Sequence, residues 1–199
     1  MPTPVPPELP TPTAWLTFRA FTAADGERVH RLVGDPEVMR HLQGGALAPE
    51  RVEEKVLVPM LTAAAEQPGY GRICVERRDD GAFIGWVSLV PRVPDGGPMY
   101  GWVRCAVGAP VVELGYRVVR EAWGMGLATE AAGAAIEHAL TTLGASTVVA
   151  TTMAVNAGSR RVLERLGFTL AVVRFLQWHE PNPGWEQGEA EYVLDARPV

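Results

Sequence analysis

The chain has 199 residues, a size that fits one folded domain with a core of its own. It carries 18 Lys and Arg against 23 Asp and Glu, a formal net charge of −5, and its only lysine is Lys55. We therefore expect no nucleic-acid surface, because such a surface needs clustered cations. No apolar run approaches the roughly 20 residues of a membrane span and no signal peptide is visible, so we expect a cytoplasmic protein without membrane contact. Two cysteines and four scattered histidines predict neither a disulfide framework nor a metal site.

The first residues differ in composition from the rest of the chain. Residues 1–13 hold six prolines and neither a cationic nor an apolar stretch, which predicts a disordered Pro-rich tail. A single folded domain is expected over residues 14–199. Residues 15–19 open it with the alternation of a strand.

Helix-start signals follow over the next residues. Thr22 and Asp25 have the spacing of a capping box for a short helix, and residues 35–36, Asp-Pro, begin a second helical turn. A third helix opens at residues 48–49. Pro59 within that helix predicts a kink or a break, because proline removes a backbone donor.

Two strands joined by a tight turn are predicted next. Residues 71–77 and 83–90 have strand character, and the Asp-Gly pair at residues 80–81 supplies the positive φ of a hairpin turn. The connection over residues 91–110 is longer than connections inside compact domains usually are. It is expected either to carry a hairpin extension from Met99 to Val107 or to act as a functional flap.

The most informative segment joins an apolar strand, residues 111–119, to an alanine-rich helix from Thr129 to about Leu143. Gly124 and Gly126 in the connection allow a sharp turn that leaves backbone N–H groups exposed at the positive end of the helix dipole. This arrangement predicts a cradle for a pyrophosphate, and hence a cofactor that carries a diphosphate.

One common nucleotide motif is excluded at this turn and a second is disfavoured. A Walker loop requires Lys and then Ser or Thr after its second glycine, whereas Leu127 and Ala128 follow Gly126. A Rossmann fingerprint requires three glycines early in the chain and an acidic residue on the next strand, and the strand predicted over residues 147–155 has none. The turn alone leaves open the alternative of a glycine-bearing connection that binds nothing.

Further motifs follow that strand. Residues 156–168 predict an Asn-capped short helix that ends at Gly167, and two strands are expected over 168–177 and 189–195. Taken with the preceding segments, this region resembles the GNAT superfamily of acetyl-CoA-dependent N-acetyltransferases, and within it the RimJ/RimL type, which acetylates ribosomal-protein N-termini. The resemblance spans about residues 15–195. Its motifs are Glu113-Leu-Gly-Tyr116, Trp123-Gly-Met-Gly-Leu-Ala-Thr-Glu-Ala131, Asn156-x-x-Ser159 and Leu166-Gly-Phe168.

The resemblance implies a fold and an activity. The fold is a single-domain GNAT fold of the α/β class, with a mixed, mostly antiparallel β-sheet flanked by helices. The activity is direct transfer of an acetyl group from acetyl-CoA to a primary amine, with a protein N-terminal α-amine ahead of a small amine such as an antibiotic or a polyamine. The acidic chain suits a basic acceptor. A non-catalytic acyl-CoA-binding module is the rival interpretation, and a homodimer is left open.

The residues expected to bind CoA lie on the strand end, the turn and the helix start. Strand backbone is expected to pair with the extended pantetheine arm, and Arg120 to meet a phosphate. The Asn156 amide is expected to hold a pantetheine carbonyl or to cap its helix, two roles that are compatible. The full expected set is Tyr116, Arg117, Val118, Val119, Arg120, Trp123, Gly124, Met125, Gly126, Leu127, Ala128, Thr129 and Asn156.

Acetyl transfer needs a neutral amine, a stabilised oxyanion and a proton for the departing thiolate. The resemblance puts a base or water-relaying carboxylate on the strand before the cradle, which is Glu113 here, with a structural acid as the alternative. Many members place a thiolate-protonating Tyr seven residues after the Asn, and that position is Leu163 here. Ser159, alone or through water, is therefore the candidate acid, against a plain helix-start serine.

Aromatic residues gather in two long connections, residues 91–110 and 178–188, which the resemblance places near the acceptor. We expect these residues to contact the acceptor, with local packing as the alternative, and Trp86 to belong to the core. The candidates are Tyr100, Trp102, Trp178, His179 and Trp185.

Overall fold

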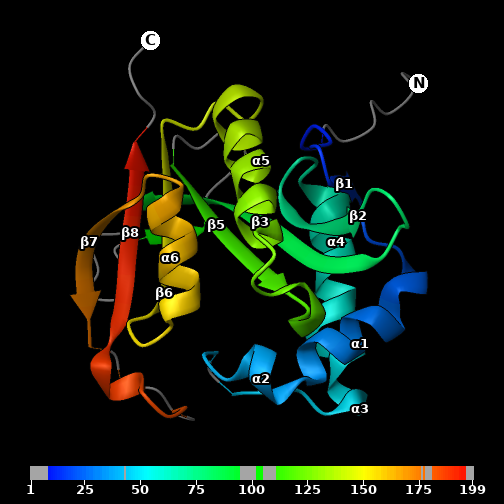
Figure 1. The fold of residues 1–199 in the computed structure, drawn as a ribbon, viewed down its shortest axis with the longest axis horizontal. Coiled ribbons are helices and arrows are strands. Elements are labelled where there is room, and N and C mark those ends of the chain that lie inside the picture. The colour runs from blue at the N-terminus through cyan, green and yellow to red at the C-terminus, as the bar shows by residue number, and fades with distance from the viewer. Residues whose placement is uncertain are drawn as a thin grey trace.

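The computed structural model describes residues 9–42, 44–94, 102–104, 111–175, 177 and 181–195. They form one mixed sheet in the order β1-β2-β3-β5-β6-β8-β7, and β4 pairs with the end of β3 (Figure 1). All neighbouring pairs are antiparallel except β5 with β6. The strands are β1 Leu16–Arg19, β2 Gly71–Arg77, β3 Phe83–Pro94, β4 Trp102–Arg104, β5 Val111–Val118, β6 Thr147–Met153, β7 Thr169–Arg174 and β8 Glu189–Asp195.

Helices cover both faces of this sheet. The α-helices are α1 Gly26–Gly34, α2 Pro36–Met39, α3 Pro49–Val52, α4 Val58–Glu66, α5 Leu127–Thr141 and α6 Ala157–Arg165. Helices α5 and α6 lie on one face, and α1 to α4 lie against the other (Figure 1). This is the mixed, mostly antiparallel α/β architecture that the sequence predicts. No helix among the described residues is long and apolar enough to cross a membrane.

Strand alternation sends neighbouring side chains into two separate cores. Ile73 and Val75 join the larger cluster beneath α5, whereas Cys74 between them joins the cluster beneath α1 to α4. Trp86, directly opposite Cys74, is 3% exposed and belongs to the second cluster, as predicted. The two faces of the sheet therefore pack against different clusters, and the face on which a residue lies decides which part of a site its side chain reaches.

The predicted helix starts are confirmed in detail. The capping box at Thr22 and Asp25 is present, and the Asp35 side chain accepts the Glu37 N–H at 2.8 Å. The third helix is interrupted, as Pro59 predicts, but the break is a π-helical turn at Glu53–Leu57 that ends just before α4. Proline lacks a backbone donor, so the helix changes its hydrogen-bond pattern ahead of it.

Three boundaries differ from the sequence expectation. Helix α5 begins at Leu127, two residues early, because Gly126 in the left-handed region acts as its N-cap. Strand β3 continues to Pro94 and pairs with β4, which supports the hairpin extension; the rest of Met99 to Val107 lies outside the described residues. Strand β7 ends at Arg174 rather than at residue 177.

Part of the expected N-terminal tail is described. Leu9 packs against the larger core cluster, and the Thr13 hydroxyl donates to the Glu130 carboxylate on α5 at 2.5 Å. Glu130 also accepts the Trp15 N–H at 3.0 Å. Residues 9–13 are thus tied to α5, while residues 1–8 lie outside the described part of the chain.

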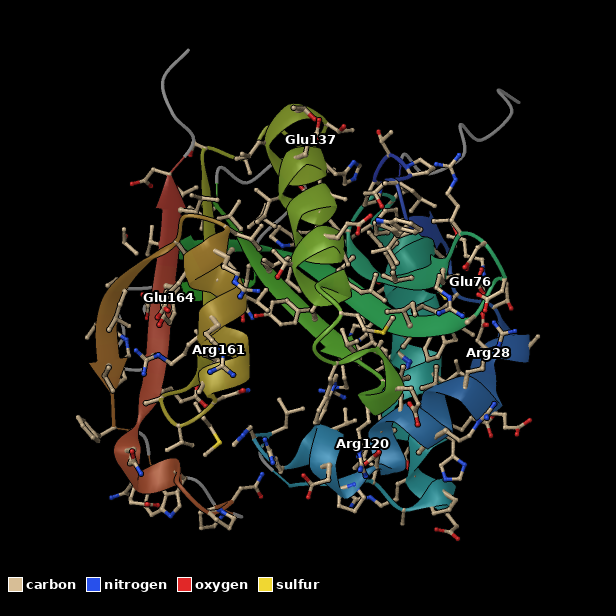
Figure 2. The ribbon with its side chains drawn as sticks, in the orientation of Figure 1. Arg28, Glu76, Arg120, Glu137, Arg161 and Glu164 are labelled. Carbon is tan, nitrogen blue, oxygen red and sulfur yellow. The ribbon has the colours of Figure 1, made fainter. Side chains whose placement is uncertain are left out.

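An ion-pair cluster joins the first strand to the first helices. Arg19 makes a bidentate pair with Asp25 at 2.7 and 2.8 Å and also donates to Glu76, which in turn pairs with Arg28 at 2.8 Å. Figure 2 shows Arg28 and Glu76 side by side. Asp25 is 3% exposed, and Arg19 holds the pKa of its carboxyl at about 2 against a usual 3.8.

Asp25→Asn is expected to lower the free energy of unfolding by roughly 2 kcal/mol near pH 7, because it leaves Arg19 without its bidentate partner. The folded pKa of Asp25 is lowered, so its contribution is present above about pH 4 and is lost as the pH falls toward 2. Denaturant unfolding at several pH values measures this. Glu27→Gln, which removes an exposed pair with Arg31, is the control and should change little. The prediction is contradicted if the difference in free energy of unfolding between the native and Asp25→Asn proteins does not become smaller as the pH falls.

Candidate active site

A cleft of about 770 Å³ opens where β5 and β6 separate. These parallel strands pair only from Val111 to Glu113 with residues 147–149, although both continue beyond that point. The cleft is lined by β5 and neighbouring positions of β2 and β3, the end of β6, the turn before α5, helix α6, and α2 with the segment after it. Its volume is in the range of small-molecule sites.

Strand β5 presents backbone groups to this opening. The Val119 N–H donates to the Ile84 carbonyl at 2.9 Å, so residue 119 is bonded to β3. In an antiparallel ladder such bonds alternate, and the N–H groups of Tyr116 and Val118 therefore face the other way, toward β6. Val118 confirms the direction, because its carbonyl accepts the Trp123 indole N–H at 2.9 Å. Of the strand residues expected at the pantetheine arm, these two offer free N–H groups to the cleft, while those of Arg117 and Val119 are directed at β3.

The glycine turn has the geometry that an anion cradle requires. Gly124 and Gly126 have φ of 75° and 81°, and a Cβ on either would meet nothing within 4 Å. Open space therefore lies over the turn at the positive end of the 15-residue helix α5. The turn fits the diphosphate of CoA, with Trp123, Ala128 and Thr129 also in the cleft wall.

Four residues of the expected CoA set lie outside the cleft lining. Arg120 sits in a short 3-10 turn with its Nη1 3.9 Å from Asp35 Oδ2, and Val119 lies beside it. The Leu127 side chain is 6% exposed and packs in the core, whereas Met125 is exposed. Any contact of Leu127 with a cofactor is therefore one of backbone.

Tyr116 and Ser159 form a hydroxyl pair across the cleft. Tyr116 Oη lies 2.8 Å from Ser159 Oγ and 3.0 Å from the Ser159 carbonyl oxygen. Burial raises the pKa of Tyr116 to about 12, so the phenol keeps its proton at neutral pH. Sequence reasoning selected Ser159 but valued Tyr116 only for its backbone. The one available signal was the missing tyrosine at position 163, which left a hydroxyl to be supplied from elsewhere.

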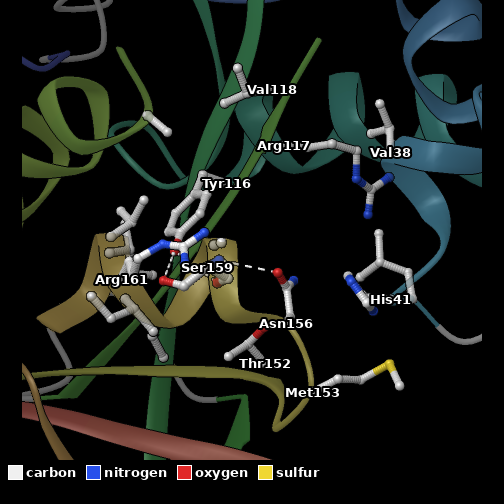
Figure 3. Close-up of a pocket in the computed structure, with 18 of the residues that line it drawn as sticks. Val38, His41, Tyr116, Arg117, Val118, Thr152, Met153, Asn156, Ser159 and Arg161 are labelled. Atoms are coloured by element: carbon white, nitrogen blue, oxygen red, sulfur yellow. Dashed lines mark hydrogen bonds between the residues drawn. The ribbon is translucent and has the colours of Figure 1, made fainter. Parts of the chain in front are cut away.

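Asn156 caps α6, as one of its two predicted roles requires. Its Oδ1 accepts the Ser159 N–H at 3.1 Å, the dashed bond in Figure 3. The same bond fixes the first turn of α6 and with it the position of the Ser159 hydroxyl. Asn156 also lines the cleft.

Glu113 lies in the cleft wall next to Arg92 of β3, with which it forms an ion pair. Thr151 on β6 donates to the same carboxylate at 3.5 Å, a long contact. The carboxylate is 24% exposed, so it is reachable from the cleft. This geometry suits a carboxylate that takes a proton directly or through water, and it equally suits an acid that anchors Arg92.

A second wall of the cleft escaped the sequence reasoning. Val38 of α2 and His41, just after that helix, face Arg117 of β5, whose side chain extends toward them, away from Tyr116 and Ser159 (Figure 3). Strand periodicity was the usable signal, because Glu113 and Arg117 are four residues apart on β5 and thus on one face.

The expected aromatic acceptor residues are only partly placed. Tyr100, Trp178 and His179 lie outside the described residues, and of Trp102 only its place in β4 is described. Trp185 is half-buried in a 3-10 turn and does not line the described cleft. Trp86 lines the cleft from within the core.

The sheet splits beside a glycine turn at a helix start, and the walls of the opening carry a carboxylate and two hydroxyls. This arrangement defines an acyltransferase site that fits CoA. Comparison with known proteins agrees. Residues 16–169 match the model of the acetyltransferase (GNAT) domain family, so the chain belongs to this family of acyltransferases, whose donor is acetyl-CoA.

The names of individual relatives refer to different acceptors. FsC-acetyl coenzyme A-N(2)-transacetylase of Aspergillus fumigatus is 31% identical over 160 residues, which cover 80% of this chain and 65% of that protein. This chain thus spans slightly less than two thirds of that relative's length. Among solved structures, RimL, a ribosomal L7/L12 α-N-protein acetyltransferase in complex with CoA, superposes with a TM-score of 0.73 at 16% identity, covering 94% and 98% of the two chains. A spermidine N-acetyltransferase from Vibrio cholerae gives 0.69 at 17%, covering 92% and 96%.

Proposed function

We propose that this chain transfers the acetyl group of acetyl-CoA directly to a protein N-terminal α-amine, as a member of the RimJ/RimL branch. The observation that carries the proposal is one cleft that joins the glycine cradle to the Glu113 carboxylate and the Tyr116–Ser159 pair. Direct transfer uses no cysteine nucleophile, and Cys74, the cysteine that the structure describes, is fully buried with its pKa raised by burial to about 12.

The cofactor would supply an activated acetyl group and a thiolate leaving group. Backbone N–H groups from Gly124 to Thr129 would hold its diphosphate, and those of Tyr116 and Val118 would align the amides of its arm. The Tyr116 phenol, still protonated at neutral pH, would pass a proton through the Ser159 hydroxyl or donate it itself. Glu113 would take the proton of the amine.

The acceptor class follows from how much help each amine needs. An α-amine has a pKa of about 8 and a lysine-type amine about 10.4, so an α-amine is neutral far more often at pH 7. Glu113 already forms an ion pair with Arg92. A modest base is sufficient for an α-amine, and the likeness to RimL points the same way.

Thiol release from acetyl-CoA tests the proposal. Peptides with free N-termini should release CoA-SH faster than spermidine, and N-terminally blocked peptides should release none. Preference for spermidine would instead assign a small-amine acetyltransferase. Tight CoA binding with no thiol release from any amine would assign an acyl-CoA-binding module.

Tyr116→Phe is expected to lower kcat roughly a hundredfold, because it removes the phenol proton and the partner of Ser159 together. Ser159→Ala should lower kcat less than Tyr116→Phe does if Tyr116 donates its proton directly. It should lower kcat by as much if the proton passes through Ser159. The affinity for CoA, measured by calorimetry, should stay nearly constant in both variants. Near-normal kcat in both would remove the pair from the mechanism.

A further inference from the structure

One face of the sheet carries a row of polar residues into the cleft. Glu113, Gly115 and Arg117 alternate along β5 and so share a face. Across the antiparallel ladder, Ser88 lies opposite Gly115 and Trp86 opposite Arg117, and Arg72 lies opposite Ser88 on β2. Directly opposite residues of a sheet share a face, so all six belong to the wall on the α1 to α4 side.

Arg117 occupies an unusual position on that face. Its guanidinium lies 4.8 Å from the centre of the Trp86 ring, and the Arg72 guanidinium lies 5.4 Å from the same ring. Burial, and then the nearby charge of Arg72, lower the pKa of Arg117 to about 10. Among the described residues no carboxylate comes within ion-pair distance of Arg117. A partly buried cation held beside another cation lacks the counter-charge that such groups normally receive.

The wall opposite Arg117 adds a donor. Arg40 Nε donates to His41 Nε2 at 3.1 Å, so in the neutral imidazole the proton lies on Nδ1. That Nδ1 is buried and has no partner among the residues that the structure describes. Burial and the charge of Arg40 lower the pKa of His41, which favours the neutral ring.

The side chains that line the cleft carry a more positive net charge than the chain as a whole. Its described wall holds five arginines, at positions 40, 72, 117, 161 and 165, against three glutamates, at positions 37, 113 and 189. Glu37 pairs with Arg40 and Glu113 with Arg92, so two of the three acidic charges are already shared. A protein with a net charge of −5 therefore has a cleft lined by more cationic than anionic side chains.

The phosphates of CoA are a poor match for Arg117. The diphosphate cradle is the turn at the start of α5, on the other face of the sheet from Arg117 and Trp86. The Arg117 side chain extends instead toward Val38 and His41, on the side away from Tyr116 and Ser159 (Figure 3). An anion bound at this position would therefore have to come from the acceptor.

We propose that the acceptor is an acidic peptide N-terminus whose carboxylate or phosphate group binds Arg117, with Trp86 and His41 completing the pocket. The inference rests on the proposed function. Residues four apart on a strand are roughly 13 Å apart at Cα, and an extended peptide spans about 3.4 Å per residue. With the amine near Glu113, that span is shared between the acceptor backbone and the two side chains that meet, so the acid belongs to the first three residues of the acceptor. A polyamine is disfavoured, because it would bring cations to Arg117.

Matched acceptor peptides test this. One set differs only at the second and third residues: Asp or Glu, the corresponding amides Asn or Gln, phosphoserine, or Lys. The native protein should show a KM at least about tenfold lower for the acidic than for the amide peptides, the strength of a charge-assisted pair. The carboxylate and phosphoserine arms show which anion is preferred. Lys peptides should be the poorest acceptors.

Variants of Arg117 identify the residue responsible. Arg117→Gln should bring the acid-to-amide KM ratio to about one and leave the KM for acetyl-CoA unchanged. Arg117→Lys keeps the charge without the bidentate fork and should retain part of the preference. Arg51→Gln, an exposed arginine of α3 outside the cleft, makes the same charge change and should behave as the native protein. Thermal melts confirm that each variant is folded.

Several results would overturn the inference. One is equal KM for acidic and amide peptides with the native protein, and another is an unaltered preference in folded Arg117→Gln. A raised KM for acetyl-CoA in Arg117→Gln with the acid preference intact would assign the residue to the cofactor. If no peptide is acetylated, the proposed function fails, and calorimetry of acidic and amide peptides on the CoA-loaded protein still decides whether Arg117 binds an anion.

Discussion

Gly126→Val should raise the Kd for CoA by at least about a hundredfold while the protein still folds. The free protein has space for the side chain, because a Cβ at residue 126 meets nothing within 4 Å. That same space is where a diphosphate must approach the N–H groups at the start of α5. The valine therefore blocks several charge-assisted hydrogen bonds at once, each worth roughly 1.5–3 kcal/mol. Calorimetry with CoA measures the loss.

Gly144→Val is the matched control for this experiment. Gly144 follows the other end of α5, has φ of 68°, and also shows nothing within 4 Å of a Cβ. Both variants therefore carry a β-branched residue in the left-handed region, a strain of roughly 1–3 kcal/mol, so their melting temperatures should fall similarly. CoA binding should fall in Gly126→Val alone. Equal affinity in the two folded variants would show that the turn does not hold the diphosphate.

Local signals in the sequence were sufficient for the parts of the fold that local chemistry decides. The capping box at Thr22, the Asp35 cap, the break before Pro59 and the glycine turn each depend on hydrogen bonds or φ angles within a few residues. Such features are specified where they occur. The choice of the cradle as the central motif needed only two glycines and a helix start.

Contacts between distant segments were beyond that reasoning. Tyr116 meets Ser159 43 positions later, and Glu113 meets Arg92 because β5 and β3 pair in one register. Neither contact has a sequence spacing that predicts it. His41 reaches the cleft wall only because the segment after α2 folds over the sheet. Pairing register and helix placement, which depend on the two buried cores, decide these parts of the site.

Glu113→Gln is expected to lower kcat by about 10² to 10⁴, with the largest loss at low pH. An α-amine with a pKa of about 8 is mostly protonated below pH 7, so transfer there depends on a group that removes the proton. Above about pH 8.5 solvent has already removed it, and the gap between the native and variant enzymes should narrow. The KM for acetyl-CoA should change little, because Glu113 lies before the strand residues that face the pantetheine arm. Full pH profiles of kcat measure both effects.

Arg92→Gln separates a base from an anchor. If Glu113 serves only to hold Arg92, removing either partner breaks the same ion pair, and the two variants should lose the same activity and the same stability. If Glu113 takes the amine proton, Arg92→Gln keeps that carboxylate in the cleft wall and should retain most of the low-pH activity that Glu113→Gln loses. A loss in Glu113→Gln that is constant with pH, and matched by Arg92→Gln, would make Glu113 a structural acid. Each variant leaves one charged group of the pair without its partner, the guanidinium in Glu113→Gln and the carboxylate in Arg92→Gln, and this lowers the stability of the fold. Thermal melts of both variants therefore show how much of a shared loss of activity is due to unfolding.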